Sequence, residues 1–385
     1  MESAIALFAF LATVVPLCGV VAALTPFLMP KRECFAVTVP ETAHADPVIK
    51  GFKKSYALRC LVLTAACTAA VAAAFCTGLA AGFSEDAASL FSGVFIAATL
   101  VVTFVPFAFM LVFRRKVAAL KQERGWGAAR QTAAALVAEG DIPRAIPLAW
   151  NLLYLPVALA VAGVGIAAWP SMPAMIPMHA DFAGNVTDFA PKSIGTVFGF
   201  PLAVIAFMAA AFTFSHWTIA RSKRPVDPSA PVASALAYGM FVRAQSIFLL
   251  ATGLIVSGAV GVSFMLATTG AIGLGESAAI ILAACVPVTV GAIALALVYG
   301  QSGARLARRL QAAESSEEDS LPADDDRRWK LGVFYFNPDD SSLFLPKRFG
   351  IGWTVNFARP AVWACLAASG LAPVVLITVI SSLAA

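Results

Sequence analysis

The stretch that decides the fold spans residues 88–113 and reads ASLFSGVFIAATLVVTFVPFAFMLVF. It contains no charged side chain, an acidic pair precedes it at 85–86, and a basic cluster follows at 114–116. A helix needs about 20 mostly apolar residues to cross the hydrocarbon core of a bilayer. The stretch therefore predicts a transmembrane helix with its basic end in the cytoplasm.

Seven further stretches have the same character: 4–29, 60–83, 146–169, 194–216, 244–268, 277–300 and 361–382. The chain of 385 residues is 60% hydrophobic and 13% charged, with a mean hydropathy of +0.83. Soluble domains carry about 25% charged residues, so this composition excludes a water-soluble fold. The sequence predicts an all-α integral membrane bundle of about eight transmembrane helices.

Orientation follows from the basic residues, which mark cytoplasmic loops. Segments 31–59, 114–145, 217–243 and 301–360 hold all of the 27 Lys and Arg residues except Lys192. These segments are therefore expected in the cytoplasm, with both termini outside. Glu2 stands where a signal peptide carries positive charge, so the first stretch is expected to remain as a span. The net charge of +5 indicates contact with anionic lipids, and no nucleic-acid partner is expected.

Four units follow from this topology. Residues 1–145 form a three-span unit with basic loops, and 146–216 a two-span unit with an outer loop at 170–193. Residues 217–300 hold a cytoplasmic loop and spans six and seven. Residues 301–385 hold an acidic linker, a small module and the last span, and Arg305, Arg308 and Arg309 are expected to continue the seventh helix.

The spans lack an ionisable residue near their centre, which argues against an ion-coupled transporter. Prolines interrupt six of them, and such breaks build binding sites in some transporters. With Asn151 as one of the few polar groups, these breaks keep a transporter or flippase for an apolar substrate as an alternative. Hydrolase, zinc-protease and P-loop motifs are absent from the sequence, so no enzymatic activity and no cofactor are expected.

The outer loop contains most of the polar candidates outside the membrane. Its prolines predict an extended entry and Gly184-Asn185 a turn, so the loop is expected to form a structured cap. His179 and Asp181 fall on one side of an extended chain, and the turn would bring Asp188 towards them. These three residues are a possible metal set in a metal-dependent envelope enzyme. The plainer alternative has the acids capping backbone amides and pairing with Lys192.

This loop resembles that of a bacterial membrane-protein family that includes the SdpI-type immunity and signalling proteins, which protect cells from a secreted toxin peptide. The matching positions are Pro173, Ile176, Pro177, His179, Gly184, Asp188 and Lys192. The characterised immunity proteins are shorter than this chain. The resemblance implies a place in the bacterial cytoplasmic membrane and a peptide or envelope ligand outside.

The last cytoplasmic segment has room for a small module. Two aromatic-rich runs, 329–336 and 343–357, flank Asn337-Pro338-Asp339-Asp340 and predict one β-hairpin turning there. Asp339 and Asp340 are candidates for a cation, although acids in turns more often accept hydrogen bonds from amides. Lys347, Arg348, Trp353 and Phe357 are expected to approach the lipid headgroups.

The segment also resembles an uncharacterised module that accompanies the same outer loop in longer bacterial proteins. The matching candidates are Trp329, Tyr335, Asn337, Pro338, Asp339, Asp340, Lys347, Arg348, Gly350, Gly352, Trp353 and Asn356. Together the two resemblances favour an immunity or signal-transduction protein of receptor type. Its partners would be the bilayer, an extracytoplasmic peptide and a cytoplasmic regulator.

Overall fold

A computed structural model gives the architecture and describes residues 2–30, 32–82, 84–126, 142–180, 186–225, 230–311, 326–350 and 352–384. Within these ranges, eight helical segments are long and apolar enough to cross a membrane, which confirms the all-α membrane bundle. The helices are α1 (Glu2–Leu28), α2 (Pro47–Ala80), α3 (Glu85–Glu123), α4 (Tyr154–Ala168), α5 (Phe200–Ala220), α6 (Pro231–Thr268), α7 (Leu274–Tyr299), α8 (Ala304–Gln311) and α9 (Pro360–Ala384).

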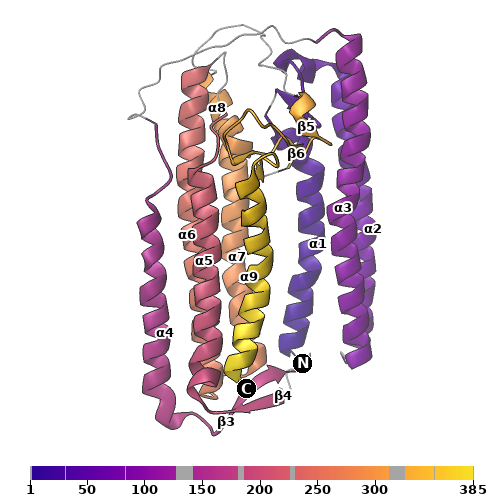
Figure 1. Cartoon of the computed structure of the whole chain (residues 1–385). Helices are drawn as coiled ribbons and strands as arrows, with labels where there is room; N and C mark the ends of the chain where they lie inside the picture. Colours follow the sequence, from indigo (N-terminus) through magenta and orange to yellow (C-terminus); the bar gives the residue numbers. More distant parts are fainter. Residues whose placement is uncertain are drawn as a thin grey trace.

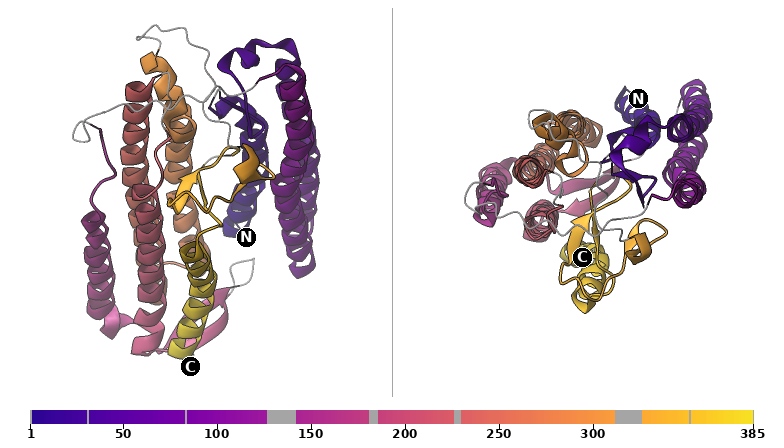
Figure 2. Two further views of the ribbon diagram at one scale, coloured as in Figure 1. Left: turned by 45° about the horizontal axis from the view of Figure 1, so that its top comes forward. Right: turned by 90° about the horizontal axis from the view of Figure 1, so that it is seen from above.

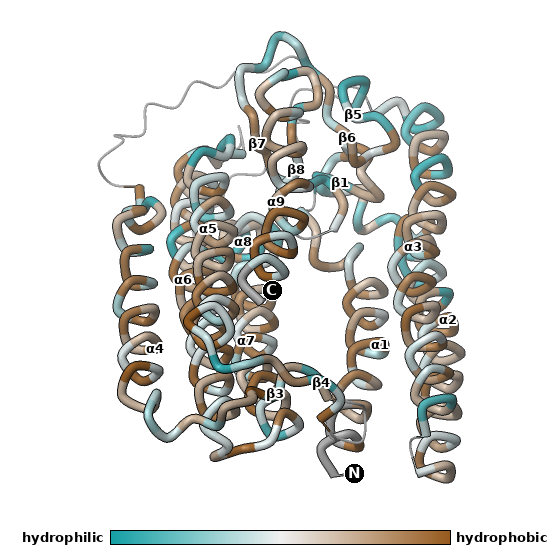
Figure 3. Tube along the Cα trace, turned by 60° about the horizontal axis from the view of Figure 1, so that its bottom comes forward, coloured by the Kyte–Doolittle hydropathy of each residue, from teal (hydrophilic) through white to brown (hydrophobic). Residues whose placement is uncertain are grey.

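The helices form two groups that lie side by side (Figure 1). The first group is α1 to α3, and the second contains α4 to α7, with α9 packed against α5. Viewed from above, the groups meet through α1 and α7 (Figure 2). Brown apolar stretches run along the helices, and the teal polar residues concentrate towards the helix ends and in the loops (Figure 3). This distribution is what a bilayer requires.

Three helices continue well beyond their apolar stretches on the side predicted to be cytoplasmic. α2 already begins at Pro47, α3 continues to Glu123, and α6 begins at Pro231. The extensions are stable because they bury side chains of their own, such as Ile49 and Tyr56 of α2. These residues pack against Phe35 and Val37 of the first loop, which contains the strands β1 (Glu33–Cys34) and β2 (Val37–Thr38).

The expected helix at Arg305, Arg308 and Arg309 is present as α8, but it does not continue α7 without a break. α7 ends at Tyr299, and Gly300 and Ser302 adopt positive φ angles of 69° and 52° before α8 begins. A Cβ atom on Gly303 would come within 2.6 Å of the Ala237 carbonyl oxygen. The break therefore lets the chain turn close against α6.

Two small β structures lie at opposite ends of the bundle (Figure 1). The outer hairpin pairs β3 (Met175–Ala180) with β4 (Val186–Pro191) at the end where both termini lie. The module at the other end, residues 326–359, is the part expected in the cytoplasm and is called the cytoplasmic module below. It contains β5 (Trp329–Lys330), β6 (Phe334–Tyr335), β7 (Phe344–Pro346) and β8 (Trp353–Val355).

The single hairpin predicted around Asn337-Pro338-Asp339-Asp340 is also wrong. Each aromatic run folds on itself, so β5 pairs with β6 and β7 pairs with β8. One parallel bridge, between Tyr335 and Asn356, joins the two pairs. Leu331 and Gly332, at φ angles of 52° and 74°, turn the first run back before it reaches Asn337.

Candidate functional site

The outer hairpin is anchored by one deeply buried side chain. Ile176 of β3 is fully buried and packs with Val161 of α4, Ile205 of α5 and Met265 of α6. The opposite strand, β4, is exposed, and its Val186 and Phe189 are 36% and 51% accessible. The hairpin thus has an inner strand attached to three helices and an outer strand that is free to contact a ligand.

His179 and Asp188 face each other across this hairpin. They are register partners, and His179 Nδ1 lies 3.4 Å from Asp188 Oδ2. Both side chains are exposed, at 74% and 64%. The predicted approach of Asp188 to His179 is confirmed.

A complete metal set is not found in the described part of the chain, where no group of three His, Cys, Asp or Glu residues is close enough to hold an ion. Asp181, the third predicted ligand, and the turn residue Gly184 lie outside the described residues. The set of three therefore stays a prediction.

Lys192 secures the end of the hairpin through backbone carbonyl oxygens. Of the two acids in the plainer alternative, Asp188 pairs with His179, and Asp181 lies outside the described residues. The Lys192 Nζ donates hydrogen bonds to the carbonyl oxygens of Trp169 and Met172, at 3.3 and 3.1 Å. The same ammonium lies 5.4 Å from the centre of the Trp169 ring, within range of a cation–π contact. Pro173 lies just before β3, and Pro177 lies within β3, where it is paired with Phe189 of β4.

A π-helical turn, Gly195–Gly199, connects the outer hairpin to α5. Thr196 is buried there, and its hydroxyl donates to the Pro191 carbonyl oxygen at 3.0 Å. Such turns are rare and often occur at functional sites, because an extra residue in the turn loosens the regular hydrogen-bond ladder. The hairpin thus continues into α5 through this π-helical turn.

Asn356 organises the cytoplasmic module. It is fully buried, and its side-chain amide donates to the carbonyl oxygens of Asn337 and Asp340 at 2.8 and 2.9 Å. Its Oδ1 accepts from the backbone N–H groups of Asn337 and Ala358 at 3.1 and 3.2 Å. One side chain therefore satisfies four backbone groups and shapes the Asn337–Asp340 loop.

Asp340 connects this loop to the end of α5 through Lys223. Its Oδ2 accepts from Lys223 Nζ at 2.7 Å and from the Tyr335 hydroxyl at 3.0 Å, and its Oδ1 accepts from the Ser342 amide at 3.0 Å. Burial alone raises the pKa of this carboxyl, but these hydrogen bonds outweigh it and hold the pKa well below its usual range. Asp339 pairs instead with Arg328, at 2.9 Å. These bonds favour the structural role that was the alternative to cation binding.

The module also packs on the ends of α5 and α6 that lie opposite the outer hairpin. The ring centres of Phe344 and Trp217 are 5.5 Å apart. The Phe344 carbonyl oxygen accepts a hydrogen bond from the backbone N–H of Lys223 at 2.9 Å. The Trp353 ring stacks on the Phe241 ring, and their centres are 5.6 Å apart. The Trp353 indole N–H donates to Ser222 Oγ at 3.0 Å, so this side chain belongs to a protein interface and the predicted approach to headgroups is wrong for it.

Gln301 holds the loop between β7 and β8. Its Nε2 donates to the carbonyl oxygens of Lys347 and Gly352, at 3.2 and 3.1 Å, while Gly352 N–H donates back to its Oε1. Gly350 and Gly352 have φ angles of 86° and 106°, which favour glycine at both positions. The Lys347 side chain remains exposed.

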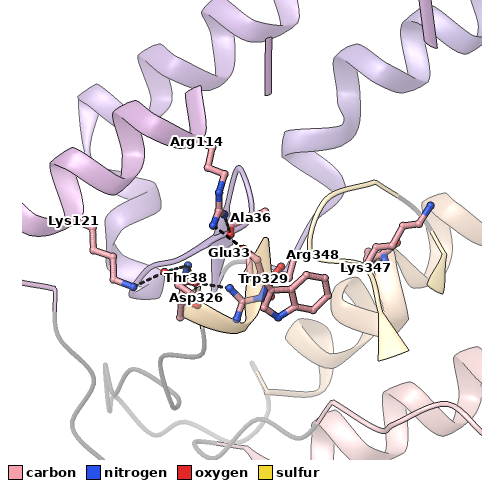
Figure 4. A network of polar contacts seen from close by, with 10 residues as sticks. Glu33, Ala36, Thr38, Arg114, Lys121, Asp326, Trp329, Lys347 and Arg348 are labelled. Atoms are coloured by element: carbon pink, nitrogen blue, oxygen red, sulfur yellow. Dashed lines mark hydrogen bonds and ion pairs between the residues drawn. The ribbon is translucent and has the colours of Figure 1, made fainter. Parts of the chain in front are cut away.

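A charged network joins the module to the first loop (Figure 4). Arg348 is only 6% exposed, its guanidinium pairs with Asp326, and it lies 5.1 Å from the centre of the Trp329 ring. Asp326 also accepts from Lys121 Nζ at 2.7 Å and from the Thr38 hydroxyl at 2.8 Å. The predicted contact of Arg348 with headgroups is therefore wrong, because an internal carboxylate binds it instead.

Two more members complete the network. Glu33 lies 3.5 Å from Arg348 Nε, and Arg114 donates to the Ala36 carbonyl oxygen and, at 3.5 Å, to that of Trp329. Sequence reasoning did not select Glu33, Thr38, Lys121 or Asp326. Their contacts join segments more than 200 residues apart in the chain, so no local spacing signals them.

Comparisons with known proteins match two segments of the chain. Residues 157–205 match the family described as "Domain of unknown function (DUF1648)", and residues 338–363 match the "Family of unknown function (DUF5808)". The first covers most of α4, the outer hairpin and the start of α5, and the second covers the later part of the module and the start of α9. No curated protein and no solved structure matches the chain. The chain is thus a multi-pass membrane protein with two segments similar to families of unknown function.

Proposed function

We propose that the protein is a receptor-like immunity or signalling protein of a bacterial cytoplasmic membrane. In this proposal the outer hairpin binds an extracytoplasmic peptide or envelope ligand, and the cytoplasmic module responds to its occupancy. The resemblance of the hairpin to the loop of SdpI-type immunity proteins supports a peptide as ligand. The exposed strand β4, with Phe189 and the His179–Asp188 pair, offers apolar and charged contacts for it.

One observation carries the proposal: α5 joins both structures. Its outer end follows the hairpin through the π-helical turn and contributes Ile205 to the packing around Ile176. Its inner end contributes Trp217, and Lys223 follows, both in contact with the module. The helix of 21 residues spans about 31 Å at 1.5 Å per residue. A ligand that favours one position of the hairpin would therefore bias the position of α5 at the module.

Survival of a deletion strain tests the ligand side. The strain would receive wild type, His179→Ala, Asp188→Ala or the matched control Thr187→Ala, which alters an exposed side chain of the same strand. Each strain is then challenged with membrane-active peptides and envelope-targeting antibiotics at equal membrane levels of the variants. We expect wild type and Thr187→Ala to protect and the other two to fail. No sensitivity in the deletion strain to any compound would contradict an immunity role.

The coupling between the two ends needs its own measurement. Asn356→Ala alters the module without touching the hairpin, so it is expected to abolish protection against the same compounds as His179→Ala. A ligand found by the survival assay should also change the intrinsic tryptophan fluorescence of wild type but not of His179→Ala. Unrelated sensitivity profiles for the two variants would show that the ends act independently.

Transport of an apolar or lipidic substrate is the second candidate. The buried hydroxyls of Tyr154, Thr252 and Ser257 have no hydrogen-bond partner among the described residues, which is unusual inside a membrane bundle. They lie on α4 and α6, where a polar part of a substrate would satisfy them. Flux in proteoliposomes that falls in Tyr154→Phe would support this function. Absence of flux across a panel of lipids and apolar solutes would remove it.

A further inference from the structure

The β5–β6 hairpin of the module has one buried face and one exposed face. Trp329 and Tyr335 are register partners, and both are buried. The opposite face presents Lys330 and its register partner Phe334, and Phe336 follows at the end of β6. The two phenylalanines are 46% and 47% exposed. Two neighbouring aromatic side chains on one exposed face indicate that this face has a partner outside the described chain.

The turn of this hairpin adds a third apolar side chain. Leu331 has a φ angle of 52° and is 55% exposed. Asn or Gly is usual in this conformation, because the Cβ atom of other residues is crowded there. Leu331 thus combines an unfavourable backbone conformation with an exposed apolar side chain. Contact of that side chain with an apolar phase would compensate for both.

Aromatic contacts connect the exposed face to α9. The Phe357 ring centre lies 5.4 Å from that of Phe334 and 5.7 Å from that of Trp363, near the start of α9. The Trp363 ring is 58% exposed, and its Nε1–H donates to the Phe357 carbonyl oxygen at 3.1 Å. An exposed Trp at the start of a membrane span is typical of the lipid–water interface. Since α9 lies at the edge of the bundle (Figure 2), the surface that it exposes to lipid continues into the hairpin.

The hairpin also lies at the level at which an apolar helix surface ends. Arg114 is the first charged residue after the apolar stretch of α3, and its Nη2 donates to the Trp329 carbonyl oxygen at 3.5 Å. β5 therefore lies within one arginine side chain of the end of that stretch. α3 itself continues to Glu123, and its upper end lies beyond β5 and β6 (Figure 1). These positions place the hairpin in the headgroup region of a bilayer.

The charges of the module suit an anionic lipid surface. Residues 326–359 contain six basic and three acidic residues. The acids pair with basic side chains: Asp326 with Lys121 and Arg348, Asp339 with Arg328, and Asp340 with Lys223. Lys330 is exposed beside Phe334. A lysine next to an apolar face is suited to headgroup phosphates, because its long side chain reaches them while the apolar face is in contact with lipid.

We propose that the exposed face of the β5–β6 hairpin lies in the headgroup region of the bilayer. Leu331, Phe334 and Phe336 point towards the acyl chains, and Lys330 contacts lipid phosphates. The sequence suggested this role for Arg348 and Trp353, which the fold keeps inside the protein. The lipid surface is then a direct partner of the module, whether or not the outer hairpin binds a ligand. A change in the thickness or charge of the bilayer would act on the module directly.

Spin labelling of the full-length protein in liposomes tests this position. Leu331→Cys or Phe336→Cys is labelled in a background without the native cysteines, in phosphatidylcholine and phosphatidylglycerol. Collisions of the label are measured with oxygen, which concentrates among acyl chains, and with a water-soluble nickel complex. We expect both labels to collide more with oxygen, like a label at the exposed Leu366 of α9. The control Gln122→Cys, exposed beyond the apolar stretch of α3, should collide more with nickel.

Two results would overturn the proposal. More collisions with nickel at both hairpin positions would place this face in water. Few collisions with either reagent would show that protein covers it, as in a dimer of this chain. Adding Phe334→Ser should shift the Phe336→Cys label towards nickel, whereas Ser341→Ala should not, and the absence of a shift would also count against the proposal. All these changes are at exposed side chains, and thermal unfolding of each variant checks the native fold.

Discussion

The Glu33 carboxylate lies 3.5 Å from Nε of Arg348, in the interface between the first loop and the module. Desolvation by burial raises the pKa of Glu33 to about 7, although Arg348 and Arg114 oppose the rise. The nearby carboxylate of Asp326 adds to it. Arg348 is therefore shared between two acids, and Asp326 is the more tightly bound of them.

This arrangement predicts a pH dependence. The folded state binds a proton at Glu33 more tightly than the unfolded state, whose carboxyl titrates near 4.5. The contribution of Glu33 to stability is thus greatest below about pH 4.5 and falls as the pH rises to about 7, by up to about 3 kcal/mol. Glu33→Gln should reduce the fall in unfolding temperature between pH 5.5 and pH 8. The control Glu41→Gln, at a more exposed acid of the same loop, should retain it.

Asn356→Ala should destabilise the module. The change leaves four backbone groups without their partner in a buried place, and each such loss costs about 1–3 kcal/mol before local relaxation. We expect trypsin to cleave faster at Lys347 and Arg348, because the opened loop frees the backbone at both residues and exposes the buried Arg348 side chain. Ser341→Ala, at an exposed position of the same segment, should be cut at the wild-type rate. Unchanged cleavage of Asn356→Ala would show that the loop does not depend on this side chain.

Ile176→Ala should loosen the outer hairpin. A buried Ile→Ala change costs about 2–5 kcal/mol because it leaves a cavity, here among Val161, Ile205 and Met265. Hydrogen exchange of the hairpin amides should accelerate. The neighbour Met175 is 49% exposed, so Met175→Ala supplies the matched control with little change expected.

The orientation is tested by labelling single cysteines in a background without the native ones. We expect Thr187→Cys in the outer hairpin to react with a membrane-impermeant maleimide in intact cells. Ser341→Cys in the module should react only after permeabilisation, because the basic loops place the module inside. The reverse labelling pattern would show the opposite topology, with the module outside the cell.

The sequence predicted the spans because a bilayer imposes a length and a composition on each helix separately. It also predicted that Asp188 approaches His179, since a turn between two extended runs brings their residues together. The prediction of a single hairpin in the module was wrong. Each of the two aromatic runs on either side of Asn337 forms a hairpin of its own. The first of these hairpins turns at Leu331 and Gly332, which have positive φ angles. Leucine rarely adopts this conformation, so the sequence does not indicate a turn at this position.

The network of Arg348 was beyond local reasoning for a different reason. Arg348 next to Lys347 before a span has the composition of a headgroup contact, and only the fold shows that Asp326 and Glu33 surround it. Likewise a Cβ atom on Gly239 would come within 2.4 Å of the carbonyl oxygen of Pro143, which lies about 100 residues earlier in the chain. Long-range contacts of this kind depend on the tertiary arrangement and leave no periodic trace.

The contact between Thr38 and Asp326 also sets an order of assembly during synthesis. The two residues are 288 positions apart. A ribosome that adds 5–20 residues per second needs roughly 15–60 s to proceed from one to the other. The first three helices therefore enter the membrane well before the partner of Thr38 and Lys121 exists. Throughout that interval the nascent chain carries an unfinished cationic surface at one end of its helices, and the last fifth of the polypeptide completes it.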